Sequence, residues 1–528
     1  MLHDTRTLCA FFNYKGDIKM CGFLVVGSEE FELQVFQKAL DKAAYRGPDY
    51  QHVSIDHGIT WGFNRLSIMD LSTNGNQPFV YKDYTLVCNG EIYNYPALKT
   101  KLESSYTFKS GSEVLIPLYE QYGLEILCKY LDAEFALVLY DNKTKQLMAA
   151  RDPMGIRPMF YGYSKKEHQI CFASEAKALF DLCDDIMPFP PGHYYLDGQF
   201  VCYNDLSDPK TIVDDDLETI AGKLKTKLEK AVEKRFMSDA PIGYLLSGGL
   251  DSSLVCAIGQ KLSDKPIRTF AIGMESDPID LKYAKQVADY LGTEHTEVIM
   301  NKEDLYQHLK EVIYHLETFD ITTIRASMAM YILCKYIHQN TDIKVIMTGE
   351  VSDELFGYKY TDFAPNAKAF QEEASKRIKE LYMYDVLRAD RCISAHALEG
   401  RVPFADLDFV DYSMSIDPAK KMNVYNKGKY LLRHAFEGTD YLPHDILFRE
   451  KAAFSDAVGH SMVDYLKELA EDKYSDEDVL NAKDKYSYCT PFTKESLMYR
   501  DIFESFFPQQ GQWIKDFWMP NKEWENCD

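Results

Sequence analysis

Hydrophobic residues follow two different patterns along the chain, and the change falls near residue 206. In the first part, short apolar runs are separated by Gly, Pro and Asn. They predict buried β-strands at residues 21–27, 85–88, 135–140 and 146–150. A helical stretch is expected after the first strand, up to residue 45. Residues 188–205 contain Pro-Pro-Gly and are expected to form a loop and an edge strand.

Beyond residue 206, apolar residues recur at helical spacing from Leu217 to Val232, which predicts a long amphipathic helix. Predicted strands then alternate with predicted helices: strands at 242–246, 267–272 and 343–347, and helices at 250–261 and 281–291. This alternation predicts an α/β domain with a parallel, doubly wound sheet. Residues from about 355 onward are expected to add helices that pack on it. The pattern therefore divides the chain into a mixed, β-rich domain at 21–205 and an α/β domain at 206–528.

Composition narrows the class of protein. A chain of 528 residues is too long for one hydrophobic core, which agrees with two or more domains. The net charge of −23 disfavours a nucleic-acid partner, because polyphosphate binding needs a basic surface. No apolar run approaches the ~18 residues of a membrane helix. The 12 cysteines include no Cys-x-x-Cys pair, and reduced thiols in the cytoplasm are the expected state.

One glycine-rich segment carries the chemistry of phosphate binding. Residues 247–253, Ser-Gly-Gly-Leu-Asp-Ser-Ser, lie between a predicted strand and a predicted helix. Glycines allow a tight turn, and the helix N-terminus offers free N–H groups and a positive dipole end to an anion. The segment lacks the Gly-Lys-Ser/Thr of a Walker A loop. An ordinary glycine-rich turn is the alternative, but the strand–loop–helix context favours nucleotide binding.

A second polar segment follows the predicted strand at 343–347. It reads Thr-Gly-Glu-Val-Ser-Asp-Glu-Leu-Phe-Gly at residues 348–357 and holds three carboxylates. Ligands bind at the carboxyl ends of strands in open α/β sheets. The segment therefore predicts metal or substrate binding rather than a solvated acidic loop.

These motifs carry a resemblance to known families. Residues 247–253 resemble the pyrophosphate loop of ATP pyrophosphatases. Met20-Cys21-Gly22-Phe23 and several later segments resemble class II glutamine amidotransferases, which are N-terminal nucleophile hydrolases; these segments are 46–49, 64–68, 76–78, 89–94, 151–158 and 173–178. From Cys21 onward, the chain resembles glutamine-hydrolysing asparagine synthetases of the bacterial type B, with further matching segments at 322–327, 399–404 and 449–456. The resemblance implies an αββα sandwich followed by a doubly wound ATP pyrophosphatase domain with helical additions.

The resemblance assigns roles in glutamine hydrolysis. The thiol of Cys21 would attack the glutamine side-chain amide, with the free α-amine of Cys21 as base. Asn89 and Gly90 would form the oxyanion hole, and Arg65 would clamp the α-carboxylate. The rest of the glutamine pocket would be lined by Leu66, Ser67, Ile68, Met69 and Glu91. Because this mechanism needs a free amine, residues 1–20 are expected to be an extension absent from the mature protein, either a cleaved propeptide or a segment before a true start at Met20.

The resemblance also assigns roles in the second domain. ATP would bind Leu246, Ser247, Gly248, Gly249, Asp251, Ser252, Ile272, Thr348 and Gly349. Aspartate would attack the α-phosphate to give β-aspartyl-AMP and pyrophosphate. Asp251 and Asp353 would hold Mg²⁺, and Arg325 and Lys451 would neutralise the phosphates. Glu350 would act with the intermediate and with the attack of ammonia, which would arrive through an internal tunnel.

The implied reaction converts aspartate, ATP and glutamine (or ammonia) into asparagine, AMP, pyrophosphate and, from glutamine, glutamate. The expected partners are these small molecules, with no nucleic acid and no membrane, and a homodimer is left open. Three residues depart from the family pattern: Gly111 replaces an Asp that holds the glutamine α-amine, Val351 replaces a Gly, and Ala405 replaces a Leu.

The alternatives are an amidotransferase or ligase on another acid, an ammonia-dependent synthetase impaired in glutamine use, and a non-catalytic relative. Cyclising ligases of the first kind generally lack the cysteine that stands here at position 21. The intact phosphate loop disfavours the last alternative.

Overall fold

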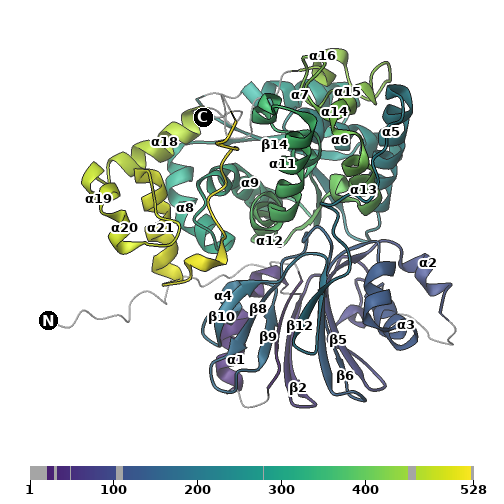
Figure 1. The fold of residues 1–528 in the computed structure, drawn as a ribbon, viewed down its shortest axis with the longest axis vertical. Coiled ribbons are helices and arrows are strands. Elements are labelled where there is room, and N and C mark those ends of the chain that lie inside the picture. The colour runs from purple at the N-terminus through teal and green to yellow at the C-terminus, as the bar shows by residue number, and fades with distance from the viewer. Residues whose placement is uncertain are drawn as a thin grey trace.

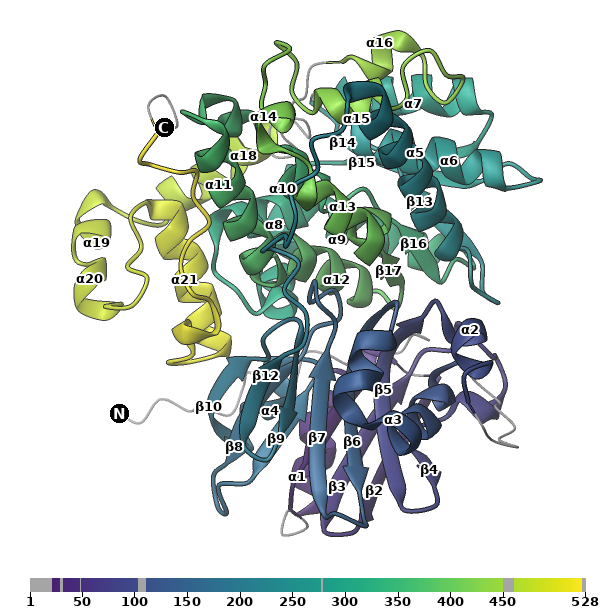
Figure 2. The ribbon, with the colours of Figure 1, turned by 45° about the vertical axis from the view of Figure 1, so that its right-hand side comes forward.

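The computed structural model describes residues 21–28, 32–47, 49–102, 111–276, 279–449 and 460–524. The extension at 1–20 and Lys451 lie outside the described residues, so the expectations for them stay predictions. The chain forms two lobes, one built on antiparallel strands and the other on a parallel sheet with many helices (Figures 1 and 2).

The first lobe is a sandwich of two six-stranded antiparallel sheets. One sheet has the order β10-β8-β9-β1-β3-β2, formed by β1 (Gly22–Val26), β2 (Tyr50–Asp56), β3 (Ile59–Arg65), β8 (Phe160–Ser164), β9 (Ile170–Ala173) and β10 (Cys183–Pro188). The other has the order β12-β11-β7-β6-β5-β4, formed by β4 (Phe79–Tyr81), β5 (Tyr84–Ile92), β6 (Ala133–Asp141), β7 (Gln146–Arg151), β11 (His193–Leu196) and β12 (Gln199–Cys202). Helices α1 (Leu33–Asp41) and α4 (Ala176–Leu179) pack on the first sheet, and α2 (Tyr95–Lys99) and α3 (Leu115–Tyr130) lie beside the second.

Alternation along fully apolar strands builds the layers of this sandwich. On β1, Phe23 and Val25 pack between the two sheets, whereas Leu24 and Val26 pack toward the helices on the outer face. Because successive side chains point to opposite faces, a strand buried on both sides shows a continuous hydrophobic run. The predicted strands were the ones with such runs, and they are the central strands of the sheets.

The second lobe has a five-stranded parallel sheet with the order β15-β14-β13-β16-β17. Its strands are β13 (Ile242–Leu245), β14 (Arg268–Met274), β15 (Glu294–Met300), β16 (Val345–Met347) and β17 (Glu399–Arg401). The strand order runs outward from β13 in one direction and from β16 in the other. The carboxyl ends of β13 and β16 therefore form the topological switch point, where doubly wound sheets bind ligands.

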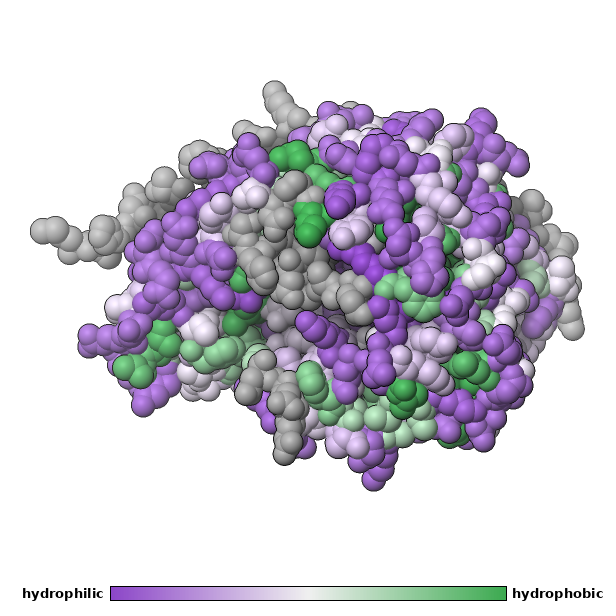
Figure 3. Space-filling model, turned by 90° about the horizontal axis from the view of Figure 1, so that it is seen from above, coloured by the Kyte–Doolittle hydropathy of each residue, from purple (hydrophilic) through white to green (hydrophobic). Residues whose placement is uncertain are grey.

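Helices surround this sheet. They are α5 (Leu217–Lys234), α6 (Leu250–Leu262), α7 (Ile279–Leu291), α8 (Lys302–Leu316), α9 (Ile321–Asn340), α10 (Ser352–Phe356), α11 (Ala367–Glu380), α12 (Asp385–Ser394), α13 (Leu407–Ser415), α14 (Pro418–Lys421), α15 (Tyr430–His434), α16 (His444–Leu447), α18 (His460–Glu471), α19 (Asp476–Leu480), α20 (Ala482–Lys485) and α21 (Lys494–Phe506). The face seen in Figure 3 is mostly hydrophilic, in keeping with the high net charge. Across the described ranges, no helix has the length and apolar character needed to span a membrane.

The predicted fold class is confirmed: an αββα sandwich precedes a doubly wound parallel sheet with helical additions. Several details differ from the expectation, and two of them concern segments for which another structure was expected. Residues 193–202 form a hairpin, β11–β12, rather than a loop with one edge strand. The region beyond 355 contributes the short strand β17, which pairs with β16. Its sequence, Glu-Gly-Arg, has no apolar residue to signal a strand.

Candidate active site

Cys21 lies immediately before β1, and its sulfur contacts the loop that follows β3. The backbone N–H of Leu66 donates to Sγ at 3.3 Å, and the thiol faces the Leu66 carbonyl at 3.5 Å. Burial raises the pKa of the Cys21 thiol to about 11, against the opposing effect of the Leu66 N–H. The thiol is therefore protonated at neutral pH, and a nucleophilic role requires a base that accepts its proton.

Asn89 and Gly90 stand on β5 with the properties of an oxyanion site. Asn89 is 1% exposed, and its Nδ2 has no hydrogen-bond partner among the residues described. A Cβ on Gly90 would lie 2.2 Å from the Glu134 carbonyl oxygen, so only glycine fits there. Gln77 fixes the preceding residue, because its side chain exchanges two hydrogen bonds with the Cys88 backbone, at 2.6 and 3.0 Å. The spare amide donor fits the stabilisation of an oxyanion.

Arg65 organises the loop expected to line the glutamine pocket. Its guanidinium donates to the carbonyls of Asp70 and Ser72 at 2.5 and 2.6 Å and to Oδ1 of Asn76 at 2.7 Å. Leu66 and Ile68 are buried beside Cys21, and the half-buried Met69 packs with them. The Ser67 N–H donates to Asp49 at 2.9 Å. The structure thus brings residues 65–69 to the thiol, with the Arg65 fork engaged by its own loop.

Glu91 follows Asn89 and Gly90 on β5, and Gly111 precedes a short turn that packs on β5. Burial raises the pKa of Glu91 to about 8, although Arg401, 3.7 Å away, opposes the shift. Gly111 begins the short 3-10 turn Ser112–Val114, and a Cβ there would make an ordinary 3.4 Å contact with the Tyr95 ring. The backbone therefore accepts an Asp at 111, but the protein carries no carboxylate at this position.

The phosphate loop joins β13 to the N-terminus of α6. Gly248 has φ +70°, and a Cβ there would lie 2.6 Å from the backbone of α7. Ser247 and Ser252 hold the turn, because their hydroxyls lie 2.9 Å apart and the Ser247 N–H donates to Ser252 Oγ at 3.2 Å. The backbone N–H groups at the N-terminus of α6 therefore lie at the switch point. This is the geometry of an anion site.

The predicted ATP residues on neighbouring strands meet at the same edge. A Cβ on Gly349, after β16, would lie 2.7 Å from the Ser252 nitrogen, so the two loops touch. Thr348 is 1% exposed, and its hydroxyl lacks a hydrogen-bond partner within the described part of the chain. Leu246 donates its N–H to the β14 carbonyl of Phe270 at 2.8 Å, and Ile272 lies two residues further along β14. The structure therefore brings together the nine residues predicted to bind ATP.

The two predicted metal ligands converge on a cation that the sequence did not reveal. The Nζ of Lys429 lies 2.8 Å from Asp251 Oδ2 and 2.8 Å from Asp353 Oδ1. Across the described ranges, no group of three or more His, Cys, Asp or Glu side chains is placed to hold a metal. Two carboxylates fit Mg²⁺ that takes its remaining ligands from substrate phosphates and water. Lys429 stands 76 residues beyond Asp353, which explains why spacing alone could not find it.

Glu350 and Arg325 are each held by a partner that the sequence analysis missed. Arg388 donates to Glu350 at 2.6 Å, and burial raises the pKa of Glu350 despite that guanidinium. Arg325 makes a two-point contact with Glu495 of α21, at 2.8 and 2.5 Å. Lys451 lies outside the described residues. The charged side chains of these two clusters thus come from six separated parts of the chain.

The two centres lie at opposite ends of the parallel strands. Cys21 and Met69 pack with Ile242 and Val345, which begin β13 and β16, whereas the phosphate loop and Thr348 follow the ends of these strands. The direction from one centre to the other therefore follows the strands of the sheet.

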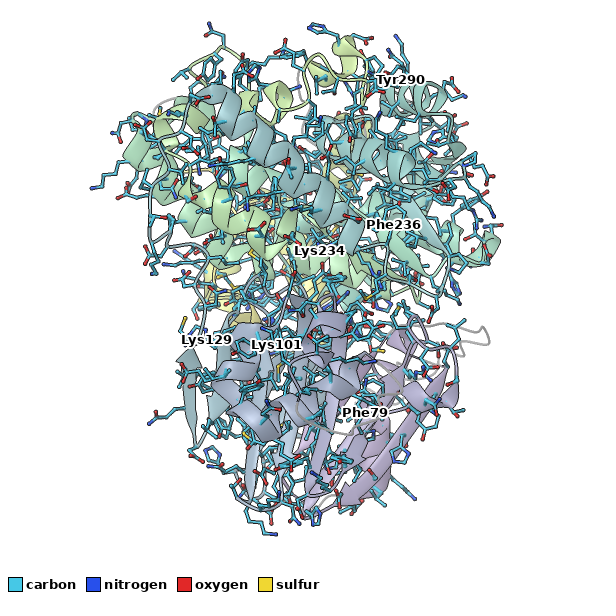
Figure 4. The ribbon with its side chains drawn as sticks, turned by 90° about the vertical axis from the view of Figure 1, so that its right-hand side faces the viewer. Phe79, Lys101, Lys129, Lys234, Phe236 and Tyr290 are labelled. Carbon is cyan, nitrogen blue, oxygen red and sulfur yellow. The ribbon has the colours of Figure 1, made fainter. Side chains whose placement is uncertain are left out.

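Buried charges join the two lobes. Arg46 of the sandwich contacts Asp390 at 2.8 Å, and Glu134 contacts Arg235 at 3.0 Å. A half-buried pair lies beside them: Lys234, at the end of α5 near the junction in Figure 4, contacts Asp132 at 2.7 Å. The sequence analysis did not foresee these contacts, because each joins residues at least 100 positions apart.

A sandwich of antiparallel sheets with a buried thiol, joined to a parallel sheet with a glycine-rich loop at its switch point, is the architecture expected of an amidotransferase joined to an ATP-using domain. A family model described as asparagine synthase matches residues 223–368 and 360–526, and one described as a glutamine amidotransferase domain matches 20–213. The chain belongs to the asparagine synthase family, as the resemblance predicted.

Curated relatives match over nearly the whole chain. The chain is 39% identical over 549 residues to the glutamine-hydrolyzing asparagine synthetase of Cricetulus griseus, covering 96% of this chain and 97% of the relative. The enzyme of Homo sapiens gives the same identity and coverage. Asparagine synthetase 2 of Oryza sativa subsp. japonica is 41% identical over 517 residues, covering 93% of this chain and 86% of the relative.

Proposed function

We propose that the protein is a carbon–nitrogen ligase that makes asparagine from aspartate, with ATP as energy source and glutamine or ammonia as nitrogen donor. The observation that carries the proposal is the pairing of two candidate centres in one chain. One has a buried thiol beside a spare amide donor, and the other has a phosphate loop at a switch point. The family membership of both halves supports the same reaction.

In the first centre, Cys21 attacks the side-chain amide carbon of glutamine. Its proton passes through the base, proposed to be its own α-amine, to the leaving nitrogen, and ammonia departs. Asn89 Nδ2 and the Gly90 N–H stabilise the oxyanion, and Arg65 with residues 66–69 and Glu91 hold the amino-acid end. Water then cleaves the thioester and releases glutamate.

In the second centre, the phosphate loop, Thr348 and Gly349 position ATP so that a carboxylate oxygen of aspartate attacks the α-phosphorus. Pyrophosphate leaves, and ammonia then displaces AMP from the β-aspartyl carbonyl to give asparagine. Arg325 and Lys451 balance negative charge on the phosphates, and Glu350 acts near the carbonyl under attack. When bound, Mg²⁺ supplies further charge neutralisation at the phosphate oxygens, with Asp251 and Asp353 as its protein ligands.

Ammonia is proposed to pass inside the protein, from Cys21 along the parallel strands to their carboxyl ends. The packing of Cys21 against the first residues of β13 and β16 supports this route. We also propose a cytoplasmic setting, which the free state of every cysteine within the described ranges supports. We further propose that the two domains of the chain meet between residues 205 and 206.

The decisive assay follows AMP, pyrophosphate and asparagine from aspartate and ATP, with glutamine or ammonia supplied separately. Asp251→Asn is expected to abolish pyrophosphate release with either nitrogen source. Cys21→Ala is expected to lose only the glutamine-dependent reaction, because its site lies in the other lobe. Loss of both activities in a folded Cys21→Ala variant would refute the two-centre reading.

One observation favours a second candidate, a synthetase that uses mainly ammonia. Gly111 leaves the glutamine α-ammonium without the carboxylate that the family pattern provides. The same assay separates the two candidates, because this one requires strong ammonia-dependent and weak glutamine-dependent synthesis.

A further inference from the structure

Lys429 is a buried cation at the centre of the proposed ATP site. Its side chain is 4% exposed, and its residue has φ +55° immediately before α15. Three oxygens surround Nζ: Asp251 Oδ2 at 2.8 Å, Asp353 Oδ1 at 2.8 Å and Ser352 Oγ at 3.0 Å. The ammonium donates hydrogen bonds to Asp251 and Ser352, and its contact with Asp353 is an ion pair.

The backbone around Lys429 is fixed. The Arg433 side chain donates from Nε to the Gly428 carbonyl at 2.7 Å, and the Arg433 backbone N–H donates to the Lys429 carbonyl at 3.1 Å. The flanking Tyr425 and Tyr430 rings stack with centroids 4.1 Å apart. The ammonium is therefore delivered to the two carboxylates by a braced loop, rather than by a side chain that samples solvent.

The remaining oxygen of Asp251 is also engaged, because Ser352 donates its hydroxyl to Oδ1 at 2.7 Å. A divalent ion that bridged Asp251 and Asp353 through the oxygens facing Nζ would have to take the place of the ammonium. An ion placed beside it would meet its positive charge at short range, in a partly desolvated setting where charge interactions are strong.

We propose that Lys429 is a built-in counterion that occupies the bridging position between Asp251 and Asp353, and so makes divalent-ion binding at this edge depend on a nucleotide. The two carboxylates and the ammonium together carry a single net negative charge. The triphosphate brings both additional negative charge and further oxygen ligands, and only then does the site favour Mg²⁺. Lys429 is thus a positioning residue that acts through the two carboxylates. The inference rests on the proposed function, which identifies the nucleotide as ATP.

The test is direct binding of Mn²⁺, measured by electron paramagnetic resonance on the full chain without nucleotide. Wild type should bind Mn²⁺ weakly, and Lys429→Met should bind one ion at least about tenfold more tightly, because the competing charge is gone. Lys429→Arg should behave as wild type. Adding Asp353→Asn to Lys429→Met should remove the gained site. Lys420→Met, which removes a half-buried lysine paired with the exposed Asp214, is the matched control and should change nothing.

Equal Mn²⁺ affinity in wild type and folded Lys429→Met would overturn the proposal. So would tight nucleotide-independent binding in wild type. If Lys429→Met does not fold, Lys429→Gln removes the charge and keeps an unbranched polar side chain, one atom shorter than lysine, and the same comparison applies. The binding measurement does not depend on asparagine formation. A protein that gains the Mn²⁺ site but makes no asparagine would therefore refute the proposed function alone.

Discussion

Gly111 is the single residue with the largest expected effect on glutamine use. A charge-assisted hydrogen bond to the α-ammonium contributes ~1.5–3 kcal/mol, so its absence weakens glutamine binding roughly ten- to a hundredfold. The loss falls on KM, because the ammonium is remote from the reacting amide. We predict a high glutamine KM, normal ammonia-dependent synthesis, and a lower glutamine KM in Gly111→Asp. The open contact at this position leaves room for the new side chain.

Steady-state kinetics with both nitrogen donors measure this. Gly222→Asp, which adds the same charge on an open surface of α5, is the control. A low micromolar wild-type KM that Gly111→Asp leaves unchanged would mean that another group, such as Asp49, holds the ammonium.

Val351 shows that a sequence departure can mark local strain. It has φ +80°, a left-handed conformation unfavourable for a β-branched residue, yet its side chain is 2% exposed. Replacement by Ala removes packing and keeps the strain, whereas Gly removes both. Val351→Gly should therefore be more stable than Val351→Ala, by about 1 kcal/mol. At Val287, buried in regular helix α7, the order should reverse by a similar amount, ~1 kcal/mol.

Urea unfolding of the four variants measures these differences. If the Ala variant were more stable than the Gly variant at both positions, residue 351 would not be strained in solution.

At the scale of elements, helix α21 holds the Arg325 guanidinium of α9 in place through an ion pair with Glu495. Glu495 is 4% exposed, accepts both ends of the Arg325 fork, and also accepts the Tyr499 hydroxyl at 2.8 Å. If Arg325 meets the phosphates, Glu495 sets its orientation. Glu495→Gln should lower kcat about tenfold with both nitrogen donors and leave the glutamine KM unchanged.

Glu504→Gln is the matched control, because Glu504 pairs with Arg500 within the same helix. A kcat that falls equally in both variants would point to a general weakening of α21 rather than to Arg325.

Elements were predictable where the sequence itself carried the signal. The central strands β1, β5 and β6 are apolar on both faces, and the Ser-Gly-Gly loop lies between a strand and a helix that follow one another in sequence. β15 and β17 were not foreseen, because one is a partly exposed edge strand rich in polar residues and the other is three residues long. Tertiary packing alone brings three further residues to these clusters: Arg388, Lys429 and Glu495. Because they lie far from the motifs in sequence, the spacing of the motifs could not predict them.

At the scale of the whole molecule, a buried cluster of six charges joins the lobes. Arg46, Glu175 and Lys177 belong to the sandwich, and Glu317, Asp390 and Arg391 belong to the second lobe. Glu175 is its hub, with Arg46, Lys177 and Arg391 at 2.8, 2.6 and 2.5 Å. Burial would raise the pKa of Glu175, but these three cations hold it well below its usual range. Arg46 also donates to the Cys21 carbonyl at 3.0 Å, so the cluster braces the nucleophile.

The last prediction follows from this hub. Glu175→Gln leaves three buried cations facing two carboxylates, and breaking such a buried network costs about 3–5 kcal/mol. The loss should fall on the junction, because the cluster spans it. Unfolding in urea should then separate into two transitions, and more glutamate should form for each asparagine as ammonia escapes. Glu120→Gln, at an exposed pair with Lys82, should change stability by less than about 1 kcal/mol. A single unshifted transition with unchanged stoichiometry would show that the lobes are held together, and ammonia retained, by contacts other than these charges.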